Sequence, residues 1–180
     1  KFRKRITVFN RIKKLKLFKY LDDQYMESFT ENGEVLFRSL SYFQQGPESD
    51  LRTDQLDGKK QYSPEKPFII KNLTQGNEFS SSEMIDPVDS ERVFVFCTSK
   101  SLKPELYERF QCSHCVEIRD VVRFIAEIDK QLKKQDKLSK IYHDDIAYYS
   151  PEKNESFEFL DPYRIPFLKR EDSFEIEDEY

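Results

Sequence analysis

A short apolar run between a glycine and a polar pair constrains the fold of this 180-residue chain more than any other stretch. Within Gly33–Phe43, the glycine favours a turn, and Val35-Leu36-Phe37 has the composition of a buried strand. The pattern predicts a strand that ends at Arg38-Ser39 and continues into a long polar loop. Strand ends and loops commonly carry binding residues, so we expect Arg38 and Ser39 to face a cleft. Tyr42-Phe43 is then expected to anchor the loop that covers it.

The remaining apolar segments predict an α+β fold. Arg92–Thr98 is β-branched and aromatic on both faces, which predicts a strand at the centre of a sheet. Because strands and helices do not alternate regularly, we expect a mixed, mostly antiparallel sheet, continuous or split, flanked by a few helices. Further strands are expected over residues 17–21, 68–70, 115–118, 140–149 and 174–180, and helices over 22–30, 105–110 and 120–137.

The length of the chain fits a single domain with its own core. We expect a basic N-terminal arm or helix over residues 1–16, followed by one α+β domain over residues 17–180. Residues 44–90 hold three of the four glycines and many Ser, Asn and Asp residues. This composition predicts a long loop region, which in a compact domain commonly covers a functional site.

Charge is distributed unevenly along the chain. The net charge of −4 excludes a general attraction to nucleic acid. Residues 1–19, however, hold nine Lys or Arg and no acid, whereas residues 150–180 hold ten Asp or Glu and four Lys or Arg. The two ends can attract each other, or the basic end can bind an anionic protein or nucleic-acid partner.

The sequence also bears on location. No apolar run approaches the roughly 20 residues that span a bilayer, so no membrane association is expected. Residues 1–19 lack the continuous apolar middle of a signal peptide. Three cysteines are an odd number, which favours free thiols in a reducing cytoplasm. Nothing in the sequence indicates an oligomeric state.

Two polar clusters are candidates for metal or redox chemistry. Cys112-Ser113-His114-Cys115 has the spacing of a zinc or dithiol motif, but no second ligand pair stands at a matching distance. Structural cysteines are therefore favoured over a metal or redox site. His143-Asp144-Asp145 can position a base or bind a metal, and it is also typical of a surface turn. We expect no metal from either cluster.

The C-terminal segment offers three carboxylates in alternation. If residues 174–180 form a strand, then Glu175, Glu177 and Glu179 share one face, with neighbours about 7 Å apart. Carboxylates in this arrangement suit acid–base chemistry or the orientation of a hydroxyl group. The alternative is an acidic, solvated edge strand that resists aggregation.

Short segments spread along the chain carry a resemblance to a known family. They are Phe18-Lys19-Tyr20, Phe37-Arg38-Ser39-Leu40-Ser41-Tyr42-Phe43, Phe96-Cys97-Thr98-Ser99, Pro166-Phe167-Leu168-Lys169 and Glu177-Asp178-Glu179-Tyr180. Their order resembles a large bacterial family of unknown function, with Tyr-Lys-Tyr, Ser-x-x-x-Phe, Phe-Ser-x-Ser and Glu-x-Glu-Tyr-Arg elements. More loosely, it resembles the ADP-ribosyltransferases, whose split β-sheet binds NAD.

The second resemblance implies a function. Glu179 would hydrogen-bond the ribose 2′-hydroxyl and stabilise an oxocarbenium-like transition state, with Glu177 beside it. Lys19 or Arg38 would hold the phosphates, although Lys19 stands where this resemblance leads one to expect Arg or His. The implied NAD-binding residues are Lys19, Tyr20, Arg38, Ser39, Tyr42, Thr98 and Ser99.

The implied protein is an ADP-ribosyltransferase-like effector of bacterial phage defence or toxin type. The alternative is a non-enzymatic module that holds a protein or nucleic-acid partner through its basic N-terminal arm.

Overall fold

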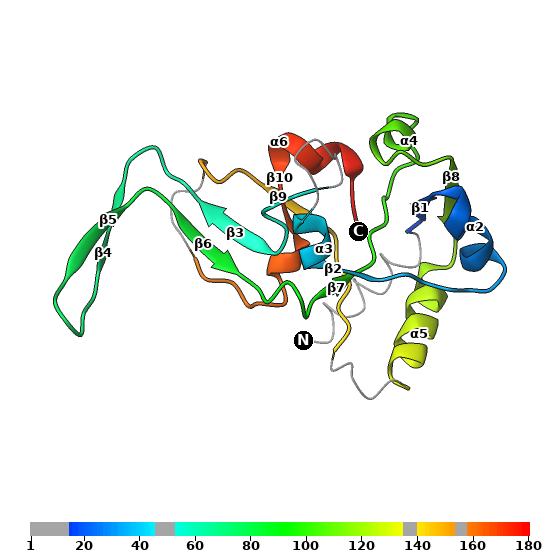
Figure 1. The fold of residues 1–180 in the computed structure, drawn as a ribbon, viewed down its shortest axis with the longest axis horizontal. Helices are drawn as coiled ribbons and strands as arrows, with labels where there is room; N and C mark the ends of the chain where they lie inside the picture. Colours follow the sequence, from blue (N-terminus) through cyan, green and yellow to red (C-terminus); the bar gives the residue numbers. More distant parts are fainter. Residues whose placement is uncertain (1–14, 46–52, 135–139, 154–157) are drawn as a thin grey trace. The chain divides into compact units, whose positions relative to one another are not determined.

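The computed structural model describes residues 15–45, 53–134, 140–153 and 158–180 (Figure 1). The basic arm expected over residues 1–16 lies almost wholly outside these ranges, so its role as a binding element stays a prediction. Among the described residues, no helix combines the length and the apolar character needed to cross a membrane.

The predicted α+β class is confirmed. The strands of the described chain form five two-stranded ladders, four of them antiparallel and one parallel, so the sheet is split and mostly antiparallel. The chain divides into two compact units, each built from segments that are distant in sequence. Unit 1 comprises Lys1–Leu36, Phe96–Asp145 and Glu177–Tyr180, and unit 2 comprises Phe37–Val95 and Ile146–Ile176.

Unit 1 is built on one antiparallel ladder. Strand β1 (Leu17–Leu21) pairs with β8 (His114–Ile118), and Leu17 stands opposite Ile118. These two residues and Val121 form the buried core, against which Phe29, Phe96 and Phe124 pack. The helices of this unit are α2 (Asp23–Thr30), α4 (Glu105–Arg109) and α5 (Val121–Leu132).

Helix α5 begins where the sequence predicts. The Asp120 side chain accepts a hydrogen bond from the Arg123 backbone N–H at 3.0 Å, which satisfies one of the unpaired donors of the first turn. Its apolar residues recur at helical spacing and face the β1–β8 ladder, with Val121 buried and Phe124 and Ile125 partly buried.

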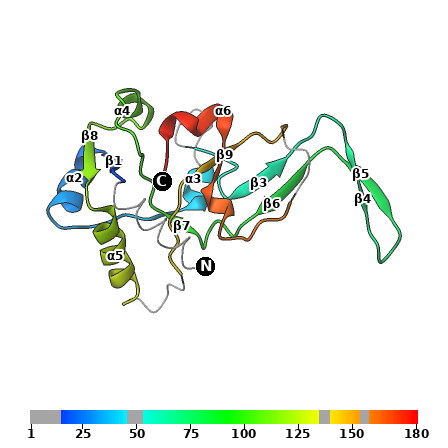
Figure 2. The same ribbon diagram turned by 180° about the vertical axis from the view of Figure 1, so that it is seen from behind.

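Unit 2 contains the other four ladders. Figure 2 shows them from behind, and β4 and β5 form a hairpin joined to β3 and β6. The pairs are β2 (Arg38–Ser39) with β7 (Phe94–Val95), β3 (Lys59–Tyr62) with β6 (Met84–Pro87), β4 (Phe68–Lys71) with β5 (Glu78–Ser81), and β9 (Ala147–Tyr149) with β10 (Leu168–Arg170). The helical segments are α3 (Leu40–Gln44), η1 (Ile165–Phe167) and α6 (Glu171–Phe174), and η2 (Glu175–Glu177) leads from unit 2 into unit 1.

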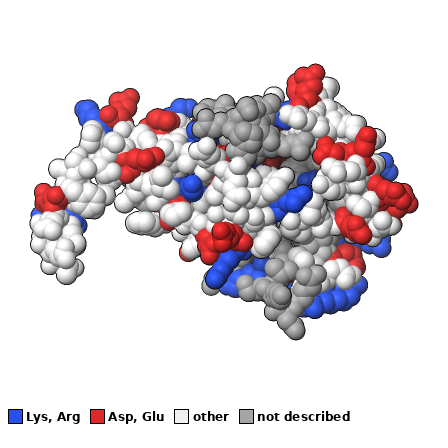
Figure 3. Space-filling model, viewed as in Figure 1, with Lys and Arg blue, Asp and Glu red and all other residues white. Residues whose placement is uncertain are grey.

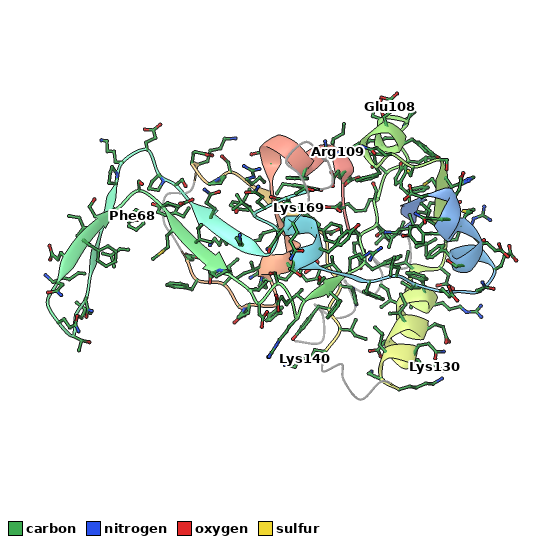
Figure 4. All side chains as sticks on the ribbon, viewed as in Figure 1. Phe68, Glu108, Arg109, Lys130, Lys140 and Lys169 are labelled. Carbon is green, nitrogen blue, oxygen red and sulfur yellow. The ribbon has the colours of Figure 1, made fainter. Side chains whose placement is uncertain are left out.

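The stretch predicted as a long loop region, residues 44–90, carries four strands in its described part, β3 to β6. The apolar strand Phe68-Ile69-Ile70 and the turn around Gly76 are confirmed as β4 and the turn between β4 and β5. In the side-chain view, Phe68 lies at the base of this hairpin, and its ring centroid is 5.5 Å from that of Tyr62 (Figure 4).

The prediction of a buried strand within Gly33–Phe43 is wrong. Only Arg38–Ser39 is a strand, Val35 is half-buried, and Leu36 is 48% exposed. The polar pair that was expected to end a longer strand is itself the short strand β2, and helix α3 follows it at once, because the Ser39 hydroxyl caps α3 by accepting a hydrogen bond from Tyr42 N. Three consecutive apolar residues are too few to distinguish a strand from other structures.

Two other predicted strands are corrected. Arg92–Thr98 was expected at a sheet centre, but only Phe94–Val95 is a strand, and it pairs with β2 alone. Residues 174–180 form the end of α6, then η2, and a single bridge at Glu179, not a continuous strand. Consequently Glu175, Glu177 and Glu179 do not share one strand face: Glu175 is exposed, while the other two are buried.

Gly58 allows a sharp test of packing in unit 2. Its φ of 72° is in the left-handed region, and a Cβ atom there would lie 2.8 Å from Leu40 Cδ1 and 3.0 Å from Val88 Cγ2. Gly76 has a similar φ of 75° with open space around it. Gly58→Ala is expected to add an overpacking penalty of about 1–3 kcal/mol to the backbone strain of about 1–2 kcal/mol that both substitutions share.

Urea unfolding of the two variants measures this difference. Gly58→Ala should lower the free energy of unfolding clearly more than Gly76→Ala. Equal losses would show that Leu40, which is only 1% exposed, moves aside freely.

Candidate functional site

The candidate site in unit 1 is organised by Ser99, which lies between two segments distant in sequence. Ser99 pairs with Phe18 of β1 on one side and with Glu179 on the other. Phe18 N–H donates to Ser99 O at 2.8 Å, and Ser99 N–H donates to Phe18 O at 2.9 Å. Both ribbon views show the C-terminal residues beside the chain that follows β7 (Figures 1 and 2).

On the side opposite Phe18, the backbone of residues 98–100 is hydrogen-bonded to the residues on either side of Glu179. Tyr180 N–H donates to Thr98 O at 2.8 Å, Thr98 N–H donates to Tyr180 O at 3.2 Å, and Lys100 N–H donates to Asp178 O at 2.8 Å. Backbone groups in buried positions must be paired, and these bonds pair the 98–100 stretch on both sides. Unit 1 thus places Lys19, Tyr20, Thr98, Ser99, Glu177 and Glu179 on neighbouring segments.

The two hydroxyl groups of the middle segment bind the C-terminal segment. Ser99 Oγ donates to the Glu177 carbonyl at 2.6 Å, and Thr98 Oγ1 donates to the Tyr180 carbonyl at 3.0 Å. Both residues are buried. Their hydroxyls therefore fix the position of residues 177–180, in addition to any contact with a ligand.

The two carboxylates differ in their surroundings. Glu177 is 3% exposed, and its Oε1 lies 2.6 Å from Nε of Arg109, whose side chain is 16% exposed. Glu179 is 4% exposed and lies opposite Ser99. Burial of a carboxylate is unfavourable unless its charge is compensated, and Arg109 provides that compensation for Glu177.

Lys19 and Tyr20 hold the chain that follows Phe96. Lys19 Nζ donates to Cys97 O at 2.8 Å and lies 4.4 Å from the centroid of the Phe96 ring. Tyr20 OH accepts from Lys103 N at 2.9 Å and donates to Ser101 O at 3.2 Å. Burial raises the pKa of Tyr20 above its ordinary value, so this phenol is neutral at physiological pH.

Sequence reasoning missed a group of charges beside Ser99. Lys100 Nζ lies 3.2 Å from one oxygen of Asp145 and 3.2 Å from one oxygen of Asp178. Ser101 Oγ donates to the other oxygen of Asp178. In addition, His143 Nδ1 and Tyr180 OH are 3.0 Å apart. The His143-Asp144-Asp145 motif was the sequence signal that could have identified this group, since His143 and Asp145 both belong to it.

Arg38, Ser39 and Tyr42 belong to unit 2. The Arg38 guanidinium lies 4.6 Å from the centroid of the Tyr42 ring, and Ser39 Oγ accepts from Tyr42 N at 3.3 Å. Arg38 and Ser39 form β2, Ser39 is the N-cap of α3, and Tyr42 lies within α3. Their role in binding NAD stays a prediction.

Among the described residues the cysteines form no disulfide bond, and Cys112 and Cys115 are partly buried. Burial raises the pKa of the Cys115 thiol, which disfavours the reactive thiolate. Within the described ranges, no group of three or more His, Cys, Asp or Glu side chains is arranged to hold a metal ion.

The described surface carries both signs of charge. In Figure 3, basic and acidic side chains both occur across the visible face, and neither sign covers that face alone. Comparison of the chain with protein-family models, with curated proteins and with solved structures found no match.

The Lys100–Asp178 pair predicts a pH dependence of stability. Burial alone would raise the pKa of Asp178, but hydrogen bonds from Ser101 and Lys100 outweigh it and leave the pKa below its ordinary value of 3.8. Burial likewise opposes the charge of Lys100, yet Asp178 and Asp145 raise its pKa above 10.5. The pair therefore stabilises the fold above about pH 4, and that stabilisation is lost as pH falls through the lowered pKa of Asp178 or rises through the raised pKa of Lys100.

Asp178→Asn tests this dependence and suits the local backbone, because Asp178 has a φ of 47° that Asn tolerates. At pH 7 we expect a loss of up to about 1 kcal/mol in the free energy of unfolding, since both groups are partly exposed. The difference from the wild type should shrink below pH 4. Asp89→Asn, which removes an exposed pair with Arg92, is the control with little effect. A constant difference across the pH range would contradict a charge-based role.

Proposed function

We propose that unit 1 is an ADP-ribosyltransferase-like domain that binds NAD, with Glu179 as its catalytic carboxylate. One observation carries the proposal: Ser99 lies between Phe18 and Glu179, so three of the five segments that carry the resemblance are neighbours in space. The implied basic residue, hydroxyl pair and Glu-x-Glu element come from positions that are far apart in sequence. Their proximity supports a common site.

In this proposal, Glu179 acts on the ribose end of NAD. Glu179 offers a carboxylate in a largely water-excluded position, where a hydrogen bond to a hydroxyl and the attraction to a positive charge are both strong. NAD supplies an electrophilic ribose carbon: the bond from this carbon to nicotinamide breaks, nicotinamide leaves with the bonding electron pair, and a nucleophile of the target protein forms the new bond to the carbon. Glu179 accepts a hydrogen bond from the ribose hydroxyl and stabilises the positive charge that develops as the bond to nicotinamide breaks.

The other residues have supporting roles in this proposal. Thr98 and Ser99 hold the C-terminal segment through their hydroxyls, as described above. Lys19 Nζ donates to the Cys97 carbonyl in this structure. When NAD binds, Lys19 donates to a phosphate oxygen instead and supplies positive charge beside it. In a bacterial cell, such an activity would suit an effector of phage defence or a toxin.

Substitution of Glu179 tests the proposal directly. The protein is incubated with NAD, and nicotinamide release and transfer of labelled ADP-ribose to protein are measured. Glu179→Gln keeps the size and removes the charge, so we expect the rate to fall by about 10²–10³-fold. Glu175→Gln is the matched control, because Glu175 is exposed in the same segment.

A wild-type protein that neither binds nor consumes NAD would end the proposal. The same follows if Glu179→Gln is as active as the wild type. Circular dichroism and thermal unfolding of each variant show whether a lost activity reflects a lost fold.

A further inference from the structure

Arg109 occupies a position for which neither the sequence pattern nor the resemblance assigned a role. It is the last residue of α4, a short helix that buries Leu106 completely in unit 1 (Figure 4). Its Nε donates to Oε1 of Glu177 at 2.6 Å, and both side chains are largely removed from solvent. A charge-assisted bond of this length in a buried position is strong and directional.

Glu177 is consequently held at two points. Arg109 binds its side chain, and Ser99 Oγ binds its carbonyl at 2.6 Å. The next residue, Asp178, has a φ of 47°. This left-handed turn of the backbone leads directly to Glu179, which then pairs opposite Ser99.

This geometry makes the placement of Glu179 depend on the anchoring of Glu177. Without Arg109, the Glu177 carboxylate would lose this cationic partner in a position that is 3% exposed. Loss of a cationic partner at a buried carboxylate favours movement of the carboxylate toward water. Movement of residue 177 shifts the backbone that sets the position of Glu179.

We infer that Arg109 is a positioning residue that acts through Glu177 to place the Glu179 carboxylate. The inference rests on the proposed function, since it assigns Arg109 to the same site. A displacement of about 1 Å at a reacting group costs about 10²-fold in rate, so the anchoring bond has a large expected effect on turnover.

Arg109→Lys is the informative variant, because it keeps the positive charge but loses the planar guanidinium that binds a carboxylate directionally. We expect kcat for NAD consumption to fall about 10–100-fold with a smaller change in KM. In Arg109→Gln, kcat should fall further, because this variant also removes the positive charge. Arg119→Gln is the matched control: Arg119 bonds Glu117 in the same unit, but it is exposed, and its loss should leave kcat unchanged.

Hydrogen exchange of single amides gives a readout that does not need NAD. In Arg109→Lys, the amides of Lys100 and Tyr180 should exchange faster. The Lys100 amide donates to Asp178 O in the C-terminal segment, and the Tyr180 amide donates from that segment to Thr98 O. The Ser99 amide, which donates to Phe18, should keep its protection. A merely structural role for Arg109 would instead raise exchange at all three amides together.

The outcomes separate the two proposals. An active wild type with unchanged kcat in Arg109→Lys would overturn the inference and leave the proposed function standing, and so would uniform loss of protection at the three amides. An inactive wild type would overturn the proposed function and, with it, the catalytic consequence assigned to Arg109. Localised exchange combined with lost kcat in an active protein supports the inference.

Discussion

The backbone of residues 98–100 must be satisfied away from water, and unit 1 is arranged around that requirement. Thr98 and Ser99 are buried, so an unpaired N–H or C=O group there would be strongly unfavourable. Phe18 supplies partners on one side, and residues 178–180 supply them on the other. The C-terminal segment is thus bound as an additional edge of the β1–β8 ladder, even though it is not a regular strand.

Burying this segment brings acidic side chains into the interior, and basic residues from other parts of unit 1 compensate them. Glu177 is neutralised by Arg109 of α4, and Asp178 is bound by Lys100 from the paired stretch itself. Replacement of a buried ion pair by apolar residues is often neutral for stability, so stability alone does not account for the Arg109–Glu177 pair. The directional bonds of Arg109 and Lys100, however, fix one register of the C-terminal segment, which apolar contacts specify less sharply.

Local signals in the sequence identified the elements of unit 1 well. The alternation in Leu17–Leu21 and in Cys115–Ile118, and an Asp at position 120 that can cap a helix, are all properties of neighbouring residues, and β1, β8 and the start of α5 follow them. The prediction for Gly33–Phe43 was wrong because this stretch lacks such a local pattern. Its three apolar residues have no period, so the Ser39 cap of α3 decided the local structure.

The candidate site was only partly predictable, because its defining contacts join distant residues. The hydroxyls Thr98 and Ser99 and the carboxylates Glu177 and Glu179 were singled out from their residue types. The pairing of Ser99 with Glu179, and the bond from Arg109 to Glu177, link residues that share no local pattern. Nothing in Glu105–Arg109 distinguishes that helix from a solvated, charged surface helix.

The same contacts give Glu177 and Glu179 different surroundings. A strand would have placed them on one face with similar surroundings, as two interchangeable carboxylates. The structure instead separates them by a left-handed residue and gives Glu177 a buried cationic partner and a bond to Ser99 through its carbonyl. A carboxylate that is committed to an anchoring pair is poorly suited to follow a charge that develops on a substrate. For the proposed activity, this difference favours Glu179 as the catalytic carboxylate and Glu177, with Arg109, as its anchor.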